Sequence, residues 1–204
     1  MDMPERYVIF TGRPNSGKST TIRALTGLKV RIGKRPGTTT SIDKYPIAQD
    51  LFLVDMPGYG RNLDASRGWE DETKDTILDF IEREADSIVL AVHVVNITTF
   101  LETEARLAKK GFISLDVEMV GYLHETLGEF PLVAANKIDK GNERDVTANL
   151  EAFLDRITDG YPSEASGYVF PVSAKLGVGV GPLKDCLVKT LAAKGFRNPF
   201  EYIR

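Results

Sequence analysis

An eight-residue element near the start of the chain joins an apolar run to a helical pattern, and this order restricts the fold more than any other feature. The apolar run is Tyr7-Val8-Ile9-Phe10, and the helical pattern extends from about Lys18 to Leu25. The element between them reads Gly12-Arg13-Pro14-Asn15-Ser16-Gly17-Lys18-Ser19. A Gly-x4-Gly-Lys-Ser element between a strand and a helix is typical of a loop that wraps around phosphate groups. We therefore expect a strand, a phosphate-binding loop and a helix, in that order.

The residue types of this loop suit the phosphates of a nucleotide. Glycines let backbone N–H groups turn toward phosphate oxygens, and the N-terminus of the following helix adds the positive end of its dipole. Lys18 places a cation on the β- and γ-phosphates, and the Ser19 hydroxyl can ligate Mg²⁺. The predicted nucleotide contacts run from Gly12 through Thr20. A chance glycine turn is the alternative, and the placement between strand and helix disfavours it.

Further apolar runs alternate with helical patterns along the rest of the chain. The runs lie at residues 51–54, 88–92, 132–135 and 168–170. Helical patterns lie at about 70–84, from Thr99 onward, and at 115–127, 143–157 and 182–193. Thr99-Phe100-Leu101-Glu102 reads as a capping box at the start of one helix. The alternation predicts an α/β protein with a mostly parallel sheet, and 204 residues suit one domain over 1–204.

Composition and charge narrow the class of protein. The chain has a formal net charge of −3 and a pI near 5.5, which argues against indiscriminate binding to nucleic acid. Its single cysteine, Cys186, has no partner for an internal disulfide, which fits a reducing compartment. The densest apolar stretch, residues 88–95, is far shorter than the ~20 residues that a membrane span needs. We expect a cytoplasmic protein with no membrane partner. His93 and His124 lack ligand-spaced companions and are predicted to be structural.

A second polar element, Asp55-Met56-Pro57-Gly58, follows the apolar run at 51–54. An aspartate at the carboxyl end of a strand, next to a phosphate loop, can hold Mg²⁺ through water. The backbone N–H of Gly58 can then approach the γ-phosphate, and we expect all four residues, Asp55, Met56, Pro57 and Gly58, to contact the nucleotide. A plain Asp-x-x-Gly turn is the alternative.

Two later elements suit recognition of a guanine base. Asn136-Lys137-Ile138-Asp139 follows the run at 132–135, and Ser173-Ala174-Lys175 follows a run that ends near Val172. A carboxylate at Asp139 can accept hydrogen bonds from both N1–H and the N2 amino group of guanine, and adenine lacks this donor pair. The stem of Lys137 can cover the base, Asn136 can tie its loop to the phosphate loop, and the Ala174 N–H can reach guanine O6. Ordinary polar loops are the alternative for each element taken alone.

Together these elements resemble the TRAFAC class of GTPases over almost the whole chain. Within that class, Asp55-Met56-Pro57-Gly58-Tyr59-Gly60 resembles the Asp-Leu-Pro-Gly-Tyr-Gly signature of the EngB group of ribosome-biogenesis GTPases. Pro36-Gly37-Thr38-Thr39-Thr40 resembles the group's first switch, and Asp116-Val117-Glu118-Met119 its helix before the guanine loop. Gly12-Arg13-Pro14-Asn15 occurs equally in the Era and Der groups. The resemblance implies the P-loop GTPase fold, a three-layer α/β/α arrangement with a mostly parallel six-stranded sheet.

The resemblance also implies residue roles. Gly37, Thr38 and Thr39 contact the nucleotide, and Thr39 joins Ser19 and Asp55 as a Mg²⁺ ligand, with the neighbouring Thr38 and Thr40 as the alternatives for this role. Lys18, Thr39 and Gly58 carry GTP hydrolysis. Tyr59 occupies the position at which Ras-like enzymes have a catalytic glutamine, so we expect slow intrinsic hydrolysis. Asn15 stands where several related GTPases bind K⁺ beside the phosphates, although an asparagine also suits a tight turn.

The implied partner is a precursor of the large ribosomal subunit, bound by a monomer in its GTP state. Residues 21–44 carry six bases against one acid, a basic stretch that overlaps the first switch and suits rRNA phosphates. Three other functions stay open: an Era-like GTPase in other RNA processing, a P-loop kinase or ATPase, and a nucleotide-gated binding module with negligible turnover. Asp139 disfavours the kinase or ATPase, and Tyr59 supports the binding module.

Overall fold

The structure is a computed structural model that describes residues 4–30, 42–59, 67–161 and 165–203, with the backbone alone over 67–72. Within these residues one sheet has the strand order β2-β3-β1-β4-β5-β6. The strands are β1 Arg6–Thr11, β2 Asp43–Ala48, β3 Leu51–Asp55, β4 Ile88–Asn96, β5 Leu132–Asn136 and β6 Val169–Val172. Only the β2–β3 pair is antiparallel, and the other neighbours are parallel. The predicted mostly parallel six-stranded sheet is confirmed.

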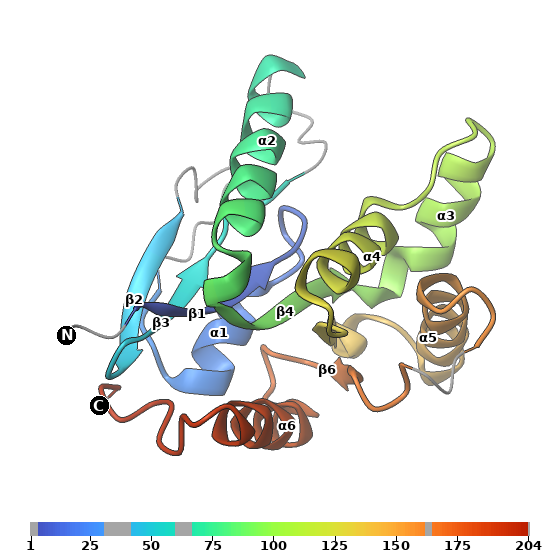
Figure 1. The fold of residues 1–204 in the computed structure, drawn as a ribbon. Helices are drawn as coiled ribbons and strands as arrows, with labels where there is room; N and C mark the ends of the chain where they lie inside the picture. The colour runs from blue at the N-terminus through green and yellow to red at the C-terminus, as the bar shows by residue number, and fades with distance from the viewer. Residues whose placement is uncertain (1–3, 31–41, 60–66, 162–164, 204) are drawn as a thin grey trace.

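Helices cover both faces of the sheet, which gives the predicted three layers (Figure 1). The helices are α1 Lys18–Thr26, α2 Arg67–Arg83, α3 Phe100–Ala108, α4 Leu115–Leu127, α5 Glu143–Ile157 and α6 Val180–Ala193. α1 and α6 cover one face, and α2 and α4 cover the other, as Figure 1 shows. None of these described helices is long and apolar enough to cross a membrane.

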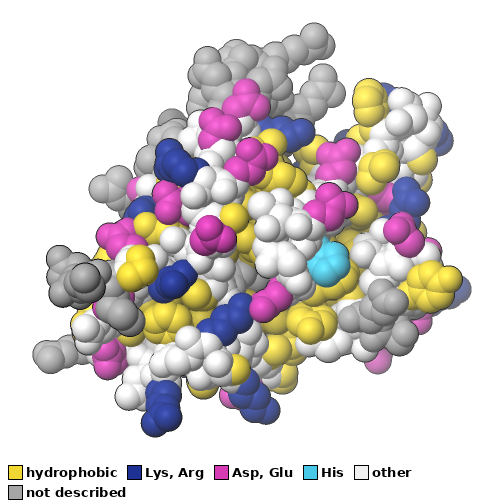
Figure 2. All heavy atoms as spheres, viewed as in Figure 1, with side chains coloured by type: hydrophobic (Ala, Val, Ile, Leu, Met, Phe, Trp, Pro, Cys, Tyr) yellow, Lys and Arg dark blue, Asp and Glu magenta, His cyan; other side chains and the backbone are white. Residues whose placement is uncertain are grey.

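Apolar side chains fill the space between the layers. On the face of α1 and α6, Ile22 and Leu187 pack with Phe10 of β1. On the opposite face, Ile77 of α2 and Leu123 of α4 pack with the other side of the sheet. Strands covered on both faces must be apolar on both faces, which explains the continuous apolar runs of β1, β4 and β5. On the face shown in Figure 2, acidic and basic side chains are interspersed over the outside of this core.

The strand β2 was not among the ranges that apolar runs predicted. Its residues alternate between partly exposed and exposed over Asp43–Tyr45, and it contains Pro46. An edge strand needs hydrogen bonds on one side only and tolerates a proline, so it lacks the apolar run of a central strand. β4 continues to Asn96, four residues beyond the predicted Val92.

The capping box predicted at Thr99 is wrong. The Thr99 side chain makes no capping hydrogen bond. Instead, the side chain of Asn149, from α5, accepts the hydrogen bond of the Leu101 backbone N–H at 2.8 Å. A helix donor that is satisfied from a distant helix leaves no local signal in the sequence.

Candidate functional site

The predicted functional elements meet at one edge of the sheet. The loop 12–17 joins β1 to α1, Asp55 ends β3, Asn136 ends β5, and Ser173 directly follows β6. Because these four strands are parallel, their carboxyl ends lie at the same edge. Elements that are separated along the chain are thereby brought together.

The phosphate-binding loop is shaped by its backbone. Gly17 has φ +99°, and a Cβ atom there would overlap the side-chain nitrogen of Asn136. Both the left-handed conformation and the close approach therefore require glycine at this position. Asn15 also adopts a positive φ, of 63°, a conformation that asparagine tolerates better than most residues. Thr20 lies in the first turn of α1.

Lys18 and Asp55 form a buried ion pair at the start of α1. Lys18 Nζ donates a hydrogen bond to Asp55 Oδ1, and the two residues are 7% and 1% exposed. The Ser19 hydroxyl lies 3.4 Å from the other carboxylate oxygen of Asp55. Burial raises the pKa of Asp55 above its usual value, although Lys18 acts to lower it. The predicted phosphate-binding cation and two of the predicted Mg²⁺ ligands therefore lie side by side.

The segment after β3 lies against the phosphate-binding loop. A Cβ atom at Gly58 would lie 2.9 Å from Pro14 N, so the two backbones are nearly in contact. Met56 was predicted to contact the nucleotide, but its side chain is fully buried among core residues. The backbone N–H of Met56 donates to Phe10 O, within strand β1, at 3.1 Å. The neighbouring Pro57 is buried as well.

Tyr59 points into the core. Its side chain is 2% exposed, and its hydroxyl lies 3.5 Å from His93 Nδ1 on β4. Burial raises its pKa well above the usual value, so the phenol is neutral. A ring held in this position is not available to orient a water molecule as a catalytic glutamine does.

The two predicted guanine loops are joined to each other and to the phosphate-binding loop. Asn136 Nδ2 donates to Ser16 O at 2.9 Å, and Asn136 Oδ1 accepts from Ala174 N at 3.0 Å. The predicted tie from Asn136 to the phosphate loop is confirmed. The Ala174 N–H, which we expected to be directed at a base oxygen, is donated to Asn136 in this structure.

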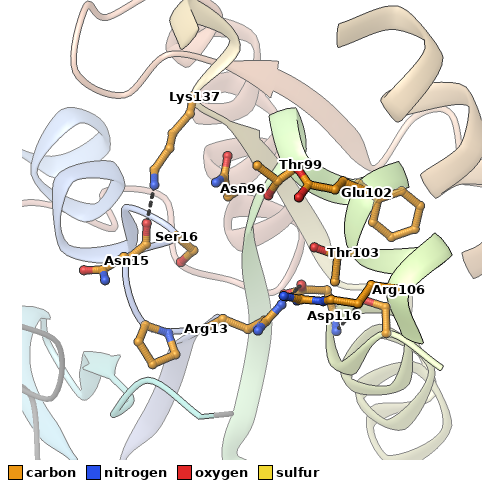
Figure 3. A pocket seen from close by; sticks show the side chains of 13 residues that line it. Arg13, Asn15, Ser16, Asn96, Thr99, Glu102, Thr103, Arg106, Asp116 and Lys137 are labelled. Carbon is orange, nitrogen blue, oxygen red and sulfur yellow. Dashed lines mark hydrogen bonds and ion pairs between the residues drawn. The ribbon is translucent and has the colours of Figure 1, made fainter. Parts of the chain in front are cut away.

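Lys137 and Asp139 complete this part of the site. Lys137 Nζ donates to Asn15 O, which lays its stem across the space between the two loops (Figure 3). Asp139 Oδ1 accepts a hydrogen bond from Ser173 Oγ at 2.6 Å, and this bond lowers the pKa of the carboxyl group. Asp139 is therefore a carboxylate near neutral pH, the form that accepts hydrogen bonds from guanine. Lys175 follows as an exposed side chain.

A buried polar network behind the phosphate-binding loop was not predicted. His93, fully buried, lies 3.1 Å from Asp116 Oδ1 through Nε2 and 3.0 Å from Thr11 Oγ1 through Nδ1. Because a carboxylate only accepts, Nε2 carries the proton. The other oxygen of Asp116 lies 3.9 Å from Arg13 Nη1. The one sequence signal for this network was a histidine within an apolar strand, because a buried imidazole needs hydrogen-bond partners. Its predicted structural role is in line with these contacts.

Part of the predicted site lies outside the described residues. The first-switch segment Pro36-Gly37-Thr38-Thr39-Thr40 and Gly60 fall there. No group of three or more His, Cys, Asp or Glu side chains suited to a metal occurs in the described part of the chain. The oxygens of Ser19 and Asp55 are nevertheless the hard ligands that Mg²⁺ prefers.

The fold and the site define a P-loop GTPase, a protein that binds GTP and GDP. The model of a family described as "50S ribosome-binding GTPase" matches residues 7–137. An EngB GTP-binding protein of Methanopyrus kandleri is 36% identical over 205 residues, 99% of each chain. A crystal structure of an EngB GTP-binding protein has a TM-score of 0.79 and 37% identity, covering 92% of this chain and 99% of that one.

These matches identify the group. The chain belongs to the EngB family of GTPases. A structure of Aquifex aeolicus Era is 21% identical with a TM-score of 0.61, covering 92% of this chain and 57% of Era, and shares the fold alone. The resemblance to EngB that the motifs indicated is therefore confirmed.

Proposed function

We propose that this GTPase is a nucleotide-gated assembly factor that binds a precursor of the large ribosomal subunit in its GTP state and is released after hydrolysis. The observation that carries the guanine-nucleotide part is the joining of three loops through Asn136, which holds Asp139 and Lys18 on one edge of the sheet. The description of the matching family as 50S ribosome-binding supports the partner.

Guanine selectivity follows from Asp139. Its carboxylate, kept ionised by the hydrogen bond from Ser173, would accept from N1–H and the N2 amino group of guanine. The stem of Lys137, held toward Asn15, would lie along one face of the base.

Mg²⁺ is the proposed metal, and Ser19 and Asp55 fit it. They would hold the ion together with Thr39, which lies outside the described residues. When bound, Mg²⁺ neutralises charge that develops on the phosphates during hydrolysis. Lys18, which pairs with Asp55 in this structure, would turn its ammonium to the phosphate oxygens, and the Gly58 N–H would approach the γ-phosphate.

Hydrolysis should be slow without an added cation, because Tyr59 is held in the core by its contact with His93. Asn15 would help to bind K⁺ beside the phosphates, and this ion would supply positive charge near the γ-phosphate. We expect GTP turnover to be faster in KCl than in NaCl at equal ionic strength, by about tenfold or more. Equal rates in the two salts would contradict K⁺ activation.

The partner surface is proposed to include the basic stretch of residues 21–44. Nucleotide state would then control how this stretch is presented to rRNA phosphates, and binding should weaken steeply as salt concentration rises. The protein would act as a cytoplasmic monomer.

Co-sedimentation with separated ribosomal subunits tests the partner. Wild-type protein is loaded with a non-hydrolysable GTP analogue, with GDP or with no nucleotide, and mixed with large or small subunits. We expect enrichment on the large subunit with the analogue only. Enrichment on the small subunit instead would favour an Era-like function in other RNA processing.

A second candidate function is a nucleotide-gated binding module with negligible turnover, and the burial of Tyr59 favours it. Single-turnover GTP hydrolysis distinguishes the two. Acceleration by large subunits would support the enzyme, and an unchanged, negligible rate over hours would support the binding module.

A further inference from the structure

A hollow of about 330 Å³ adjoins the phosphate-binding loop, and neither Lys18 nor Asp55 is among the residues that line it. One wall is the loop itself, with Arg13 and Ser16. The opposite wall is formed by Thr99, which precedes α3, and by Thr103 and Arg106 of α3, and Lys137 lies at the rim (Figure 3). None of these α3 residues was part of the predicted site.

The hollow contains hydrogen-bond donors without partners among the described residues. Arg13 Nε and Ser16 Oγ are buried atoms with no hydrogen bond, and Ser16 is 3% exposed. An arginine Nε–H can only donate, so the partner that it lacks is an acceptor. Buried polar atoms in folded proteins are seldom left unsatisfied, which points to a group that enters the hollow.

Positive charge converges on the same space. Figure 3 shows the Arg13 and Arg106 side chains reaching toward each other from opposite walls. Asp116 lies near them, but its Oδ1 is already bound to His93, and its Oδ2 is 3.9 Å from Arg13. Glu102 is the other acid in the lining, so three cations face two acids. Burial and the nearby Lys140 lower the pKa of Lys137, although the charge of Asp139 acts to raise it.

The local backbone also favours an anion. Thr99, Phe100, Glu102 and Thr103 belong to the first turn of α3, and Ser114 and Asp116 to the start of α4. Helix N-termini carry partial positive charge, and residues from the starts of both helices line the hollow.

We propose that this hollow is a second oxyanion site, which shares Arg13, Ser16 and Lys137 with the predicted nucleotide contacts and binds a phosphate group in addition to those of the nucleotide. Donors reach it from the loop, from α3 and from the rim, an arrangement that suits a tetrahedral phosphate better than a planar carboxylate. The phosphate is either free orthophosphate or a phosphodiester of RNA. Only the RNA source rests on the function proposed above.

Occupation of the site would act on the GTPase machinery through Arg13. This residue belongs to the phosphate-binding loop, and Asp116 and His93 connect it to Tyr59, which directly follows Gly58. A phosphate bound to Arg13 would therefore contact a network that links the two segments facing the γ-phosphate.

A nuclear magnetic resonance titration tests the site. ¹⁵N-labelled protein is saturated with Mg²⁺ and a non-hydrolysable GTP analogue, so that the γ-phosphate position is filled. Orthophosphate is then added at constant ionic strength. We expect the Nε–H resonances of Arg13 and Arg106 to shift along one binding curve, while that of Arg144, an exposed residue of α5, stays in place.

Two variants in the hollow and one outside it make the test specific. Arg106→Ala and Thr103→Val should each raise the half-saturating phosphate concentration, the first by about tenfold. Arg144→Ala is the matched control and should not change it. An Arg13 resonance that does not move, or that moves equally in wild type and Arg106→Ala, would overturn the proposal.

Competition identifies the source of the phosphate. A single-stranded oligoribonucleotide that displaces orthophosphate indicates RNA, and one that does not indicates the free ion. Failure of wild-type protein to bind large subunits would refute the proposed function without affecting the phosphate titration, so the two failures are distinguishable.

Discussion

Asn136 is the residue on which the assembly of the site depends most. Its amide binds the backbone of Ser16 through the nitrogen and that of Ala174 through the oxygen, so one side chain joins three loops. Gly17 leaves the space that this amide occupies. The Asn136 amide and the space left by Gly17 together explain why separate elements of the sequence form one site.

Asp139→Asn tests base recognition. The asparagine still accepts from N1–H of the base, but its NH₂ faces the N2 amino group of guanine, donor against donor. In xanthine that position is a carbonyl oxygen, which the NH₂ can bind. We expect GTP affinity to fall by about a hundredfold or more and xanthosine triphosphate affinity to rise. Competition binding with the two nucleotides measures this, and unchanged GTP preference would place the base elsewhere.

Lys18→Ala tests the buried ion pair. The change removes a cation from the phosphates, and it also leaves the Asp55 carboxylate buried without its partner. In nucleotide-free protein with chelator present, we expect unfolding free energy to fall by about 3–5 kcal/mol.

The double variant Lys18→Ala/Asp55→Asn is the control for this prediction. It removes the unpaired charge and should recover much of the lost stability in urea unfolding, while nucleotide binding stays weak. If the single and double variants were equally stable, the lost stability would not come from an unpaired Asp55 carboxylate, and the prediction would be wrong.

Among the helices and strands, α3 has an N-terminal capping partner that the local sequence cannot reveal. The Thr99-to-Glu102 pattern predicted a local cap, yet Asn149 caps the helix from α5, 48 residues further along the chain. A capping box would place the Thr99 hydroxyl on the Glu102 N–H, whereas in the structure Asn149 accepts from the Leu101 N–H, and no residue near Thr99 signals that distant partner. Tertiary packing, including Phe100 on Phe153 at 5.1 Å between ring centroids, brings α5 into reach.

Asn149→Ala tests this cap. It leaves the Leu101 N–H, which takes part in a part-buried hydrogen bond, without its partner, and we expect a loss of about 1–2 kcal/mol of unfolding free energy. Thr99→Ala, which removes an exposed hydroxyl that caps nothing, should change stability by no more than about 0.5 kcal/mol. Urea denaturation of both variants measures this, and a larger loss for Thr99→Ala would restore the local capping box.

For the whole molecule, much of the fold was predictable because a parallel sheet covered on both faces requires apolar runs, and β1, β3, β4 and β5 have them. The motifs at strand ends were predictable for a similar reason, since contact with phosphates and guanine needs particular residue types at fixed spacing. Asp55, Asn136 and Ser173 lie where these motifs indicated.

Contacts between distant segments were not predictable. The network of Arg13, Asp116 and His93 depends on how α4 packs on the sheet, which no local pattern encodes. The same holds for the C-terminal segment, where Tyr202 N–H donates to Ile47 O of β2 at 3.0 Å and Phe200 and Ile203 pack against the core. From the sequence alone, residues 195–204 could equally be docked on the domain or loose.

The affinity of the protein for large ribosomal subunits in two nucleotide states tests the nucleotide-gated function most directly. Equilibrium binding of labelled protein to purified large subunits is measured with a non-hydrolysable GTP analogue and with GDP. We predict at least about tenfold tighter binding with the analogue, in the range of ordinary allosteric coupling. Equal dissociation constants in the two states would contradict a nucleotide-gated function.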